Sequence, residues 1–122
     1  MPYLPAICAY EGLKYITRLG IGNIQAHARP LIERLHKELP GLGLTSITPF
    51  DNPAPIASFI SPEMDKIEDK LKRAFSHPAV SMSRWQKTGK DGKTENVRGM
   101  RIAVSVYNNH EDIDRFLNAL DD

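Results

Sequence analysis

The chain has 122 residues, 41% hydrophobic and 25% charged, with a formal net charge of +1. This composition is typical of one soluble globular domain spanning residues 1–122, and it excludes a disordered chain. A charge near zero gives no general attraction to nucleic acid, and no apolar run approaches the roughly 20 residues that cross a bilayer. We therefore expect a cytoplasmic protein with no nucleic-acid partner and no membrane partner. The single cysteine, which cannot form an internal disulfide, fits that compartment.

The first 40 residues predict two helices. The first runs from Pro5, which suits a first helical turn, to about residue 19, and Gly20 ends it. Because Cys8 lies among apolar neighbours in this segment, we expect a buried thiol rather than a reactive one. The second helix covers residues 24–38. Its apolar stripe is Ile24, Ala28, Leu31, Leu35 and Leu39.

The rest of the chain alternates strand and helix signals. Residues 42–48 and 55–60 read as strands, and Ser61-Pro62-Glu63 is a helix-start signal for a helix through about residue 76. Strands are predicted at 79–85 and 97–106, joined by the polar turn 87–94, and a last helix begins near Asn109. This order predicts an α+β fold: a small, mostly antiparallel sheet of about four strands with helices packed on one face.

One stretch of the sequence carries a family resemblance. It consists of Arg101-Ile102-Ala103, then Tyr107-Asn108, then Glu111-Asp112-Ile113-Asp114. Two further segments agree in order. The first is Leu4-Pro5-Ala6-Ile7 with Leu19-Gly20-Ile21-Gly22-Asn23-Ile24 and then His27, and the second is Ala79 to Arg84. Nearly the whole chain thereby resembles the C-terminal small domain of class V, fold-type I enzymes that use pyridoxal phosphate: aminotransferases, cysteine desulfurases and isopenicillin-N-epimerase-like proteins. The chain departs from the pattern at Ala103, where the family commonly has serine.

The resemblance implies that this chain forms an active site together with a large domain, which the family members carry. In the family, an arginine at the place of Arg101 binds the substrate α-carboxylate, and a guanidinium is suited to do so because its paired donors match a carboxylate. The large domain supplies the Schiff-base lysine and the cofactor contacts. We therefore expect no cofactor, no catalytic residue and no metal ligand in this chain, which would not be an active enzyme alone. The parent would be a homo-oligomeric transferase, using pyridoxal 5'-phosphate on an amino-acid substrate.

Other interpretations of the sequence remain beside this one. The chain is alternatively a stand-alone α+β interaction module that kept the small-domain fold and lost the enzyme. The basic stretch between Arg84 and Arg101 favours a solvated hairpin over a nucleic-acid surface, because only Trp85 supplies an aromatic ring near it. The histidines do not have a zinc-ligand spacing: His27 and His36 are nine residues apart rather than the three or four that place two ligands on one helix face, which argues against zinc. Tyr107 and Asn108 are expected to end a strand and begin a helix rather than to contact a ligand.

Overall fold

The computed structural model describes residues 3–122; Met1 and Pro2, which belong to the predicted 1–122 domain, lie outside the described residues. The elements in chain order are α1 (Tyr3–Leu19), α2 (Ile21–Glu38), a short 3-10 helix (Leu39–Leu42), β1 (Thr45–Ser46), β2 (Ile56–Ile60), α3 (Met64–Ala74), β3 (Ser81–Thr88), β4 (Thr94–Ala103) and α4 (His110–Asp121). The strands form an antiparallel sheet in the order β1-β2-β4-β3. The predicted α+β class with a four-stranded sheet is confirmed.

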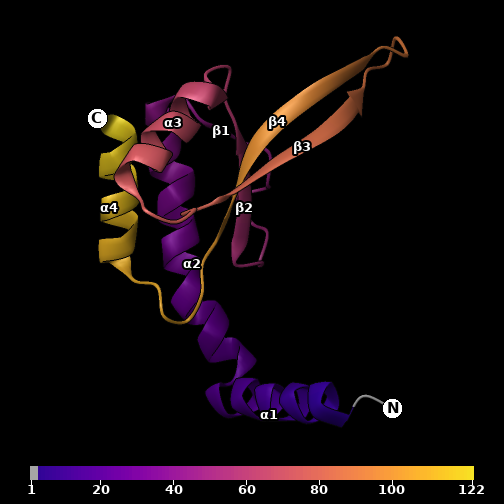
Figure 1. Cartoon of the computed structure of the whole chain (residues 1–122), viewed down its shortest axis with the longest axis vertical. Coiled ribbons are helices and arrows are strands. Elements are labelled where there is room, and N and C mark those ends of the chain that lie inside the picture. Colours follow the sequence, from indigo (N-terminus) through magenta and orange to yellow (C-terminus); the bar gives the residue numbers. More distant parts are fainter. Residues whose placement is uncertain (1–2) are drawn as a thin grey trace.

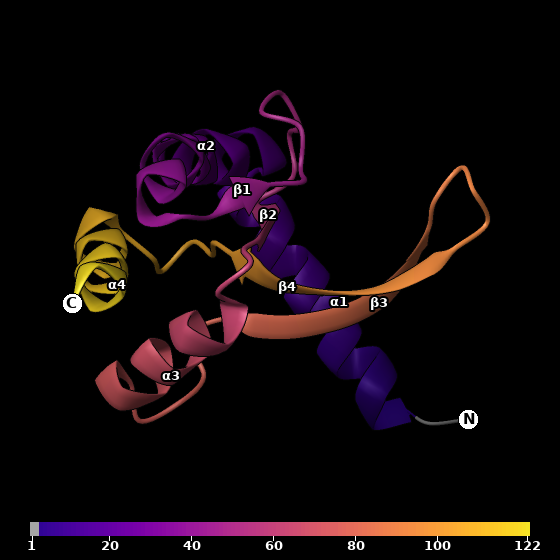
Figure 2. The same ribbon diagram turned by 90° about the horizontal axis from the view of Figure 1, so that it is seen from above.

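The sheet has one covered face and one open face. Helices α2, α3 and α4 gather on one side of it, and the β3–β4 hairpin extends away from them (Figures 1 and 2). Alternation along the strands follows this layering, since successive side chains of a strand point to opposite faces. The covered face carries Ala57, Phe59, Met100 and Ile102, which are all buried. They pack against apolar helix side chains that include Leu31, Leu35, Ile67, Leu71, Ile113 and Phe116.

Helix α4 begins as its sequence predicts. The side chain of Asn109 accepts a hydrogen bond from the Asp112 backbone N–H, and the Asp112 carboxylate accepts one from the Asn109 backbone N–H. This reciprocal capping box satisfies donors that the first turn of a helix cannot pair internally. The apolar face of α4 is then buried against the body of the fold.

The β3–β4 hairpin is longer and more regular than predicted. The ladder continues to the pair Thr88 and Thr94, so the turn shortens to residues 89–93. The Gly89 backbone N–H donates to the Lys93 carbonyl at 2.8 Å, and Gly92 adopts a φ of 77°, which favours glycine. At its other end β4 stops at Ala103 instead of residue 106, because Ser105 and Asn108 form a turn.

Helix α1 stands apart from the core. Gly20, with a φ of 84°, separates it from α2, and no residue of α1 is buried. The prediction of a buried Cys8 is therefore wrong: its side chain is exposed. The apolar neighbours that suggested burial are present, but within residues 3–122 no second layer covers them. Figure 1 shows α1 projecting from one end of α2.

Candidate carboxylate-binding site

Arg101 lies in β4 on the open face of the sheet. The register pairs it with Ser58 of β2 on one side and with Ser81 of β3 on the other. Directly opposed residues of antiparallel strands have Cβ atoms about 4.5–5.5 Å apart and project to the same face. The structure thus places a guanidinium between two serines, on the face turned away from α2, α3 and α4.

The guanidinium of Arg101 is exposed and forms no ion pair with any residue from 3 to 122. Arg98, three positions earlier in β4, projects to the covered face, where it pairs with Asp65 and Glu68 of α3. The two arginines of one strand therefore have different roles. Arg98 joins β4 to α3, whereas Arg101 keeps its donors available to a ligand.

The arrangement around Arg101 suits a carboxylate. A guanidinium presents two parallel N–H donors to the two carboxylate oxygens, and a serine hydroxyl offers one further donor. Sequence reasoning missed Ser58 and Ser81. The alternation of residues 56–60 was a usable signal, but the strand order that brings both serines beside Arg101 depends on long-range pairing.

Ala103 lies two residues beyond Arg101 and is exposed on the same open face. It supplies no hydroxyl, as the sequence indicates. The hydroxyls beside Arg101 belong to Ser58 and Ser81 on the flanking strands. The guanidinium therefore has polar neighbours even though residue 103 is alanine rather than serine.

The corner after β4 is held by Asn108. Its side-chain oxygen accepts a hydrogen bond from the Ser105 N–H at 2.8 Å, and its backbone oxygen lies 2.7 Å from Nε2 of His27 on α2. This residue ties the loop to α2 and precedes the helix cap. Tyr107 is 82% exposed. Its ring is therefore open to a partner or a ligand, while Asn108 is engaged within the fold.

The described residues do not fit a pyridoxal phosphate site. A Schiff-base lysine needs a desolvated pocket together with a phosphate site. The eight lysines of the chain lie on helix surfaces or in the hairpin; only Lys70 is partly buried, and its Nζ donates to the Leu120 carbonyl at 2.7 Å. Within residues 3–122 no group of three His, Cys, Asp or Glu side chains lies in position to hold a metal ion.

The basic side chains of the hairpin are spread along it and mixed with acids. Arg84, Lys87, Lys90 and Lys93 are exposed, and Lys87 stands opposite Glu95 in the ladder. This distribution matches the solvated hairpin that the sequence favours.

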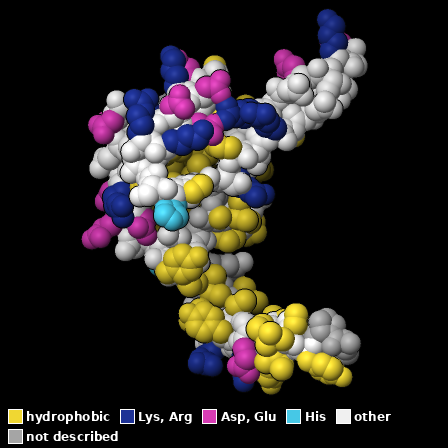
Figure 3. All heavy atoms as spheres, in the orientation of Figure 1, with side chains coloured by type: hydrophobic (Ala, Val, Ile, Leu, Met, Phe, Trp, Pro, Cys, Tyr) yellow, Lys and Arg dark blue, Asp and Glu magenta, His cyan; other side chains and the backbone are white. Residues whose placement is uncertain are grey.

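Helix α1, beyond the end of α2, carries an exposed apolar surface. Helix α1 and the hairpin both extend away from α4 (Figures 1 and 2). Figure 3 shows hydrophobic side chains over much of α1 on the face in view. The most exposed of them are Tyr3, Leu4, Ile7, Tyr10 and Leu13, each at least 58% exposed. Surfaces of this kind mark contacts with another protein surface.

No family model, no curated protein and no solved structure matches the chain. No helix among the described residues is long and apolar enough to cross a membrane. A functional assignment therefore rests on the residues themselves.

Proposed function

We propose that this chain is the small domain of a pyridoxal-phosphate-dependent enzyme of the class V aminotransferase type, and that it contributes the arginine that binds the substrate carboxylate. The observation that carries the proposal is Arg101, exposed and free of ion pairs with residues 3–122, between Ser58 and Ser81 on the open sheet face. It is the position at which the resemblance predicts such an arginine.

A second domain is needed for this arginine to bind tightly. An exposed ion pair in water contributes only about 0–1 kcal/mol, because solvent competes for both charges. When a second domain excludes water from the site, the same pair interacts in a lower dielectric, and its geometry becomes fixed. Alone, the chain should therefore bind amino acids more weakly than millimolar.

Helix α1 supports the same proposal. Its charged side chains Glu11, Lys14 and Arg18 follow a spacing of three and four residues, so they share one narrow face. The remaining sides are mainly apolar, and a helix that is apolar on most sides is normally buried. A large domain packed on the open side of the sheet would cover α1 and enclose Arg101 together.

The native protein provides the decisive experiment. It is isolated from its own cells with an antibody to this chain, reduced with borohydride and digested, and its peptides are searched by mass spectrometry for pyridoxyl-lysine. We expect such a peptide on the same polypeptide or on a stoichiometric partner. A native protein without pyridoxyl-lysine overturns the proposal.

Calorimetry tests the requirement for a second domain. The isolated chain is titrated with L-alanine and L-cysteine, and no binding at millimolar concentration is expected. Binding at 1 mM or tighter would contradict that requirement, and the variant Arg101→Gln would then show whether this arginine is responsible.

The alternative function is a stand-alone interaction module. The same exposed apolar surface of α1 favours it, since a module also needs a surface for its partner. A native protein that has the mass of this chain alone, carries no cofactor-bearing partner and contains no pyridoxyl-lysine would favour the module over the enzyme domain.

A further inference from the structure

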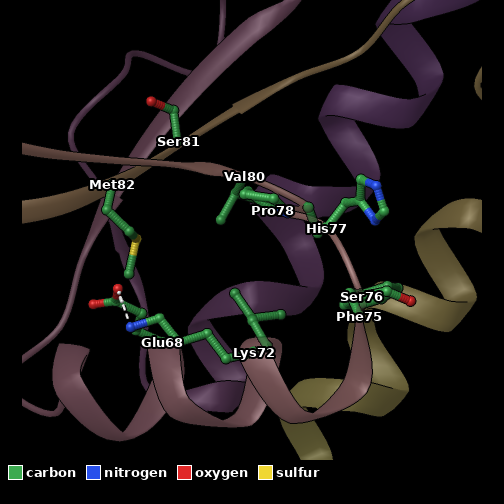
Figure 4. A pocket seen from close by; sticks show the side chains of 11 residues that line it. Glu68, Lys72, Phe75, Ser76, His77, Pro78, Val80, Ser81 and Met82 are labelled. Atoms are coloured by element: carbon green, nitrogen blue, oxygen red, sulfur yellow. Dashed lines mark ion pairs between the residues drawn. The ribbon is translucent and has the colours of Figure 1, made fainter.

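A second candidate site lies on the other side of the sheet, between α3 and β3. It is a cavity of about 480 Å³, within the range of about 300–1,000 Å³ that is usual for small-molecule pockets. Its apolar lining comprises Leu71, Phe75, Pro78, Ala79, Val80 and Met82. Figure 4 shows Met82 pointing toward α3, whereas the side chain of Ser81, which also lines the cavity, points the opposite way, toward the open face that carries Arg101.

The edge of this cavity carries an ion pair. Lys72 Nζ lies 2.8 Å from Glu68 Oε1, and both residues line the cavity (Figure 4). The second oxygen of Glu68 pairs with the guanidinium of Arg98 from β4. The side chain of Lys72 is 67% exposed, against 20% for Glu68 and 25% for Arg98.

These contacts make Lys72 the replaceable partner. When its ammonium moves away, Glu68 keeps Arg98 and is not left as an unpaired, largely buried carboxylate, which would be costly. The lysine has a flexible four-carbon stem, so its ammonium can reach a new anion at the cavity edge. The Glu68 carboxylate, in contrast, already has two cationic partners and gains little from a third.

We propose that this cavity binds a monocarboxylate with an apolar chain or ring. The apolar part lies against Leu71, Phe75 and Val80, and the carboxylate pairs with the ammonium of Lys72 at the edge. A ligand with an ammonium in place of the carboxylate would meet Lys72 as a like charge. A strongly polar ligand such as a sugar would have to give up hydrating water against the apolar side chains of Leu71, Phe75 and Val80. The proposal is independent of the function inferred for Arg101.

Octanoate is the probe that tests this proposal. The full chain, labelled with ¹⁵N, is titrated while amide shifts are followed by NMR, with octylammonium and octan-1-ol as matched ligands. We expect octanoate to shift amides of residues 71–82 with a dissociation constant at least fivefold below that of either analogue. Equal binding of octylammonium, or octanoate shifts confined to other parts of the chain, overturns the proposal.

Three variants sharpen the experiment. Lys72→Gln should weaken octanoate binding at least fivefold, whereas Lys66→Gln, an ion-paired lysine of the same helix outside the cavity, should leave it unchanged. Ala79→Phe places a ring at the exposed edge of the cavity and should abolish binding. Circular dichroism verifies the fold of each variant. If Lys72→Gln binds octanoate as the wild type does, the assigned carboxylate partner is wrong.

Discussion

The ring of Trp85 lies across Gly99 on the diagonal of the β3–β4 ladder. A Cβ atom added at Gly99 would lie 2.5 Å from Cη2 of Trp85 and 3.0 Å from the carbonyl oxygen of Phe59 in the neighbouring strand. The missing side chain therefore lets the indole rest on the backbone. This contact stiffens the base of a hairpin that otherwise extends into solvent.

Gly99→Ala should displace Trp85 and destabilise the protein by about 1–3 kcal/mol, as overpacked substitutions do. Urea unfolding followed by circular dichroism gives the free-energy change. Fluorescence of Trp85, the single tryptophan, reports whether the ring becomes more exposed.

Gly41→Ala is the matched control, because nothing lies within 4 Å of the added Cβ. It should change stability far less and leave the fluorescence spectrum as it is. An unchanged emission spectrum in Gly99→Ala would show that the ring does not depend on this glycine.

A second prediction concerns His36 in α2. Its ring lies 5.5 Å from the ring of Phe50 and 5.6 Å from that of Phe59, between centroids, and Nε2 has no hydrogen-bond partner among the described residues. Burial, and then the charge of Arg29, lower the pKa of His36 below its usual value of 6.5. The folded state therefore favours the neutral imidazole.

The sign of the pH effect follows from this shift. Between the lowered pKa of His36 and 6.5, the unfolded chain binds more protons than the folded one, so stability rises with pH. The contribution of His36 is complete above about pH 6.5 and is lost as the pH falls below it.

His36→Phe should remove this part of the pH dependence, measured as urea midpoints between pH 5 and 8. His77→Phe, at an exposed position, should keep the wild-type profile; identical profiles for wild type and His36→Phe would refute the prediction.

The parts of the fold that were predicted correctly depend on local sequence. The cap at Asn109 and the apolar spacing of Ile113, Phe116 and Leu120 are properties of neighbouring residues, and α4 forms as they indicate. The exposure of Cys8, in contrast, depends on packing between distant parts of the chain and could not be predicted from its neighbours in the sequence. Helical spacing shows that α1 has apolar sides, but not whether another layer of this chain reaches them.

The candidate site divides in the same way. Arg101 was identified from the residues around it in the sequence. Its neighbours Ser58 and Ser81 are 43 and 20 residues away, and only the order β2-β4-β3 brings them beside it. Strand order depends on how the covered face packs against the helices. No short sequence motif therefore predicts that these two serines lie beside Arg101.

A third prediction concerns Arg34, which joins α2 to α4. Its Nε donates to Glu38 at 2.6 Å and its Nη2 donates to Asp114 at 2.5 Å; the hydrogen bond to Glu38, and then the one to Asp114, raise the pKa of Arg34. Arg34→Ala should cost about 1 kcal/mol, since each partly exposed pair contributes up to about 1 kcal/mol.

Arg34→Lys keeps the charge but cannot serve both carboxylates through a planar fork, so it should restore only part of that loss. Urea unfolding at low and high salt measures both variants, and the loss should shrink at high salt because the pairs are screened. Full stability in Arg34→Ala would show that the link between the helices is not energetically significant.

The last prediction concerns the exposed surface of α1. Its 17 residues span about 25 Å as a helix, with apolar side chains on most of its sides. When no other domain covers this surface, two copies of the chain should bury it against each other, because apolar area removed from water stabilises the associated state. We expect the mass measured by light scattering to rise above that of a monomer as concentration increases.

The double variant Leu13→Gln, Ile16→Gln should weaken the association at least tenfold. The control Glu11→Gln, Arg18→Gln alters the charged face without changing the net charge, and it should associate as the wild type does. A monomeric mass at all concentrations would show that α1 does not mediate self-association.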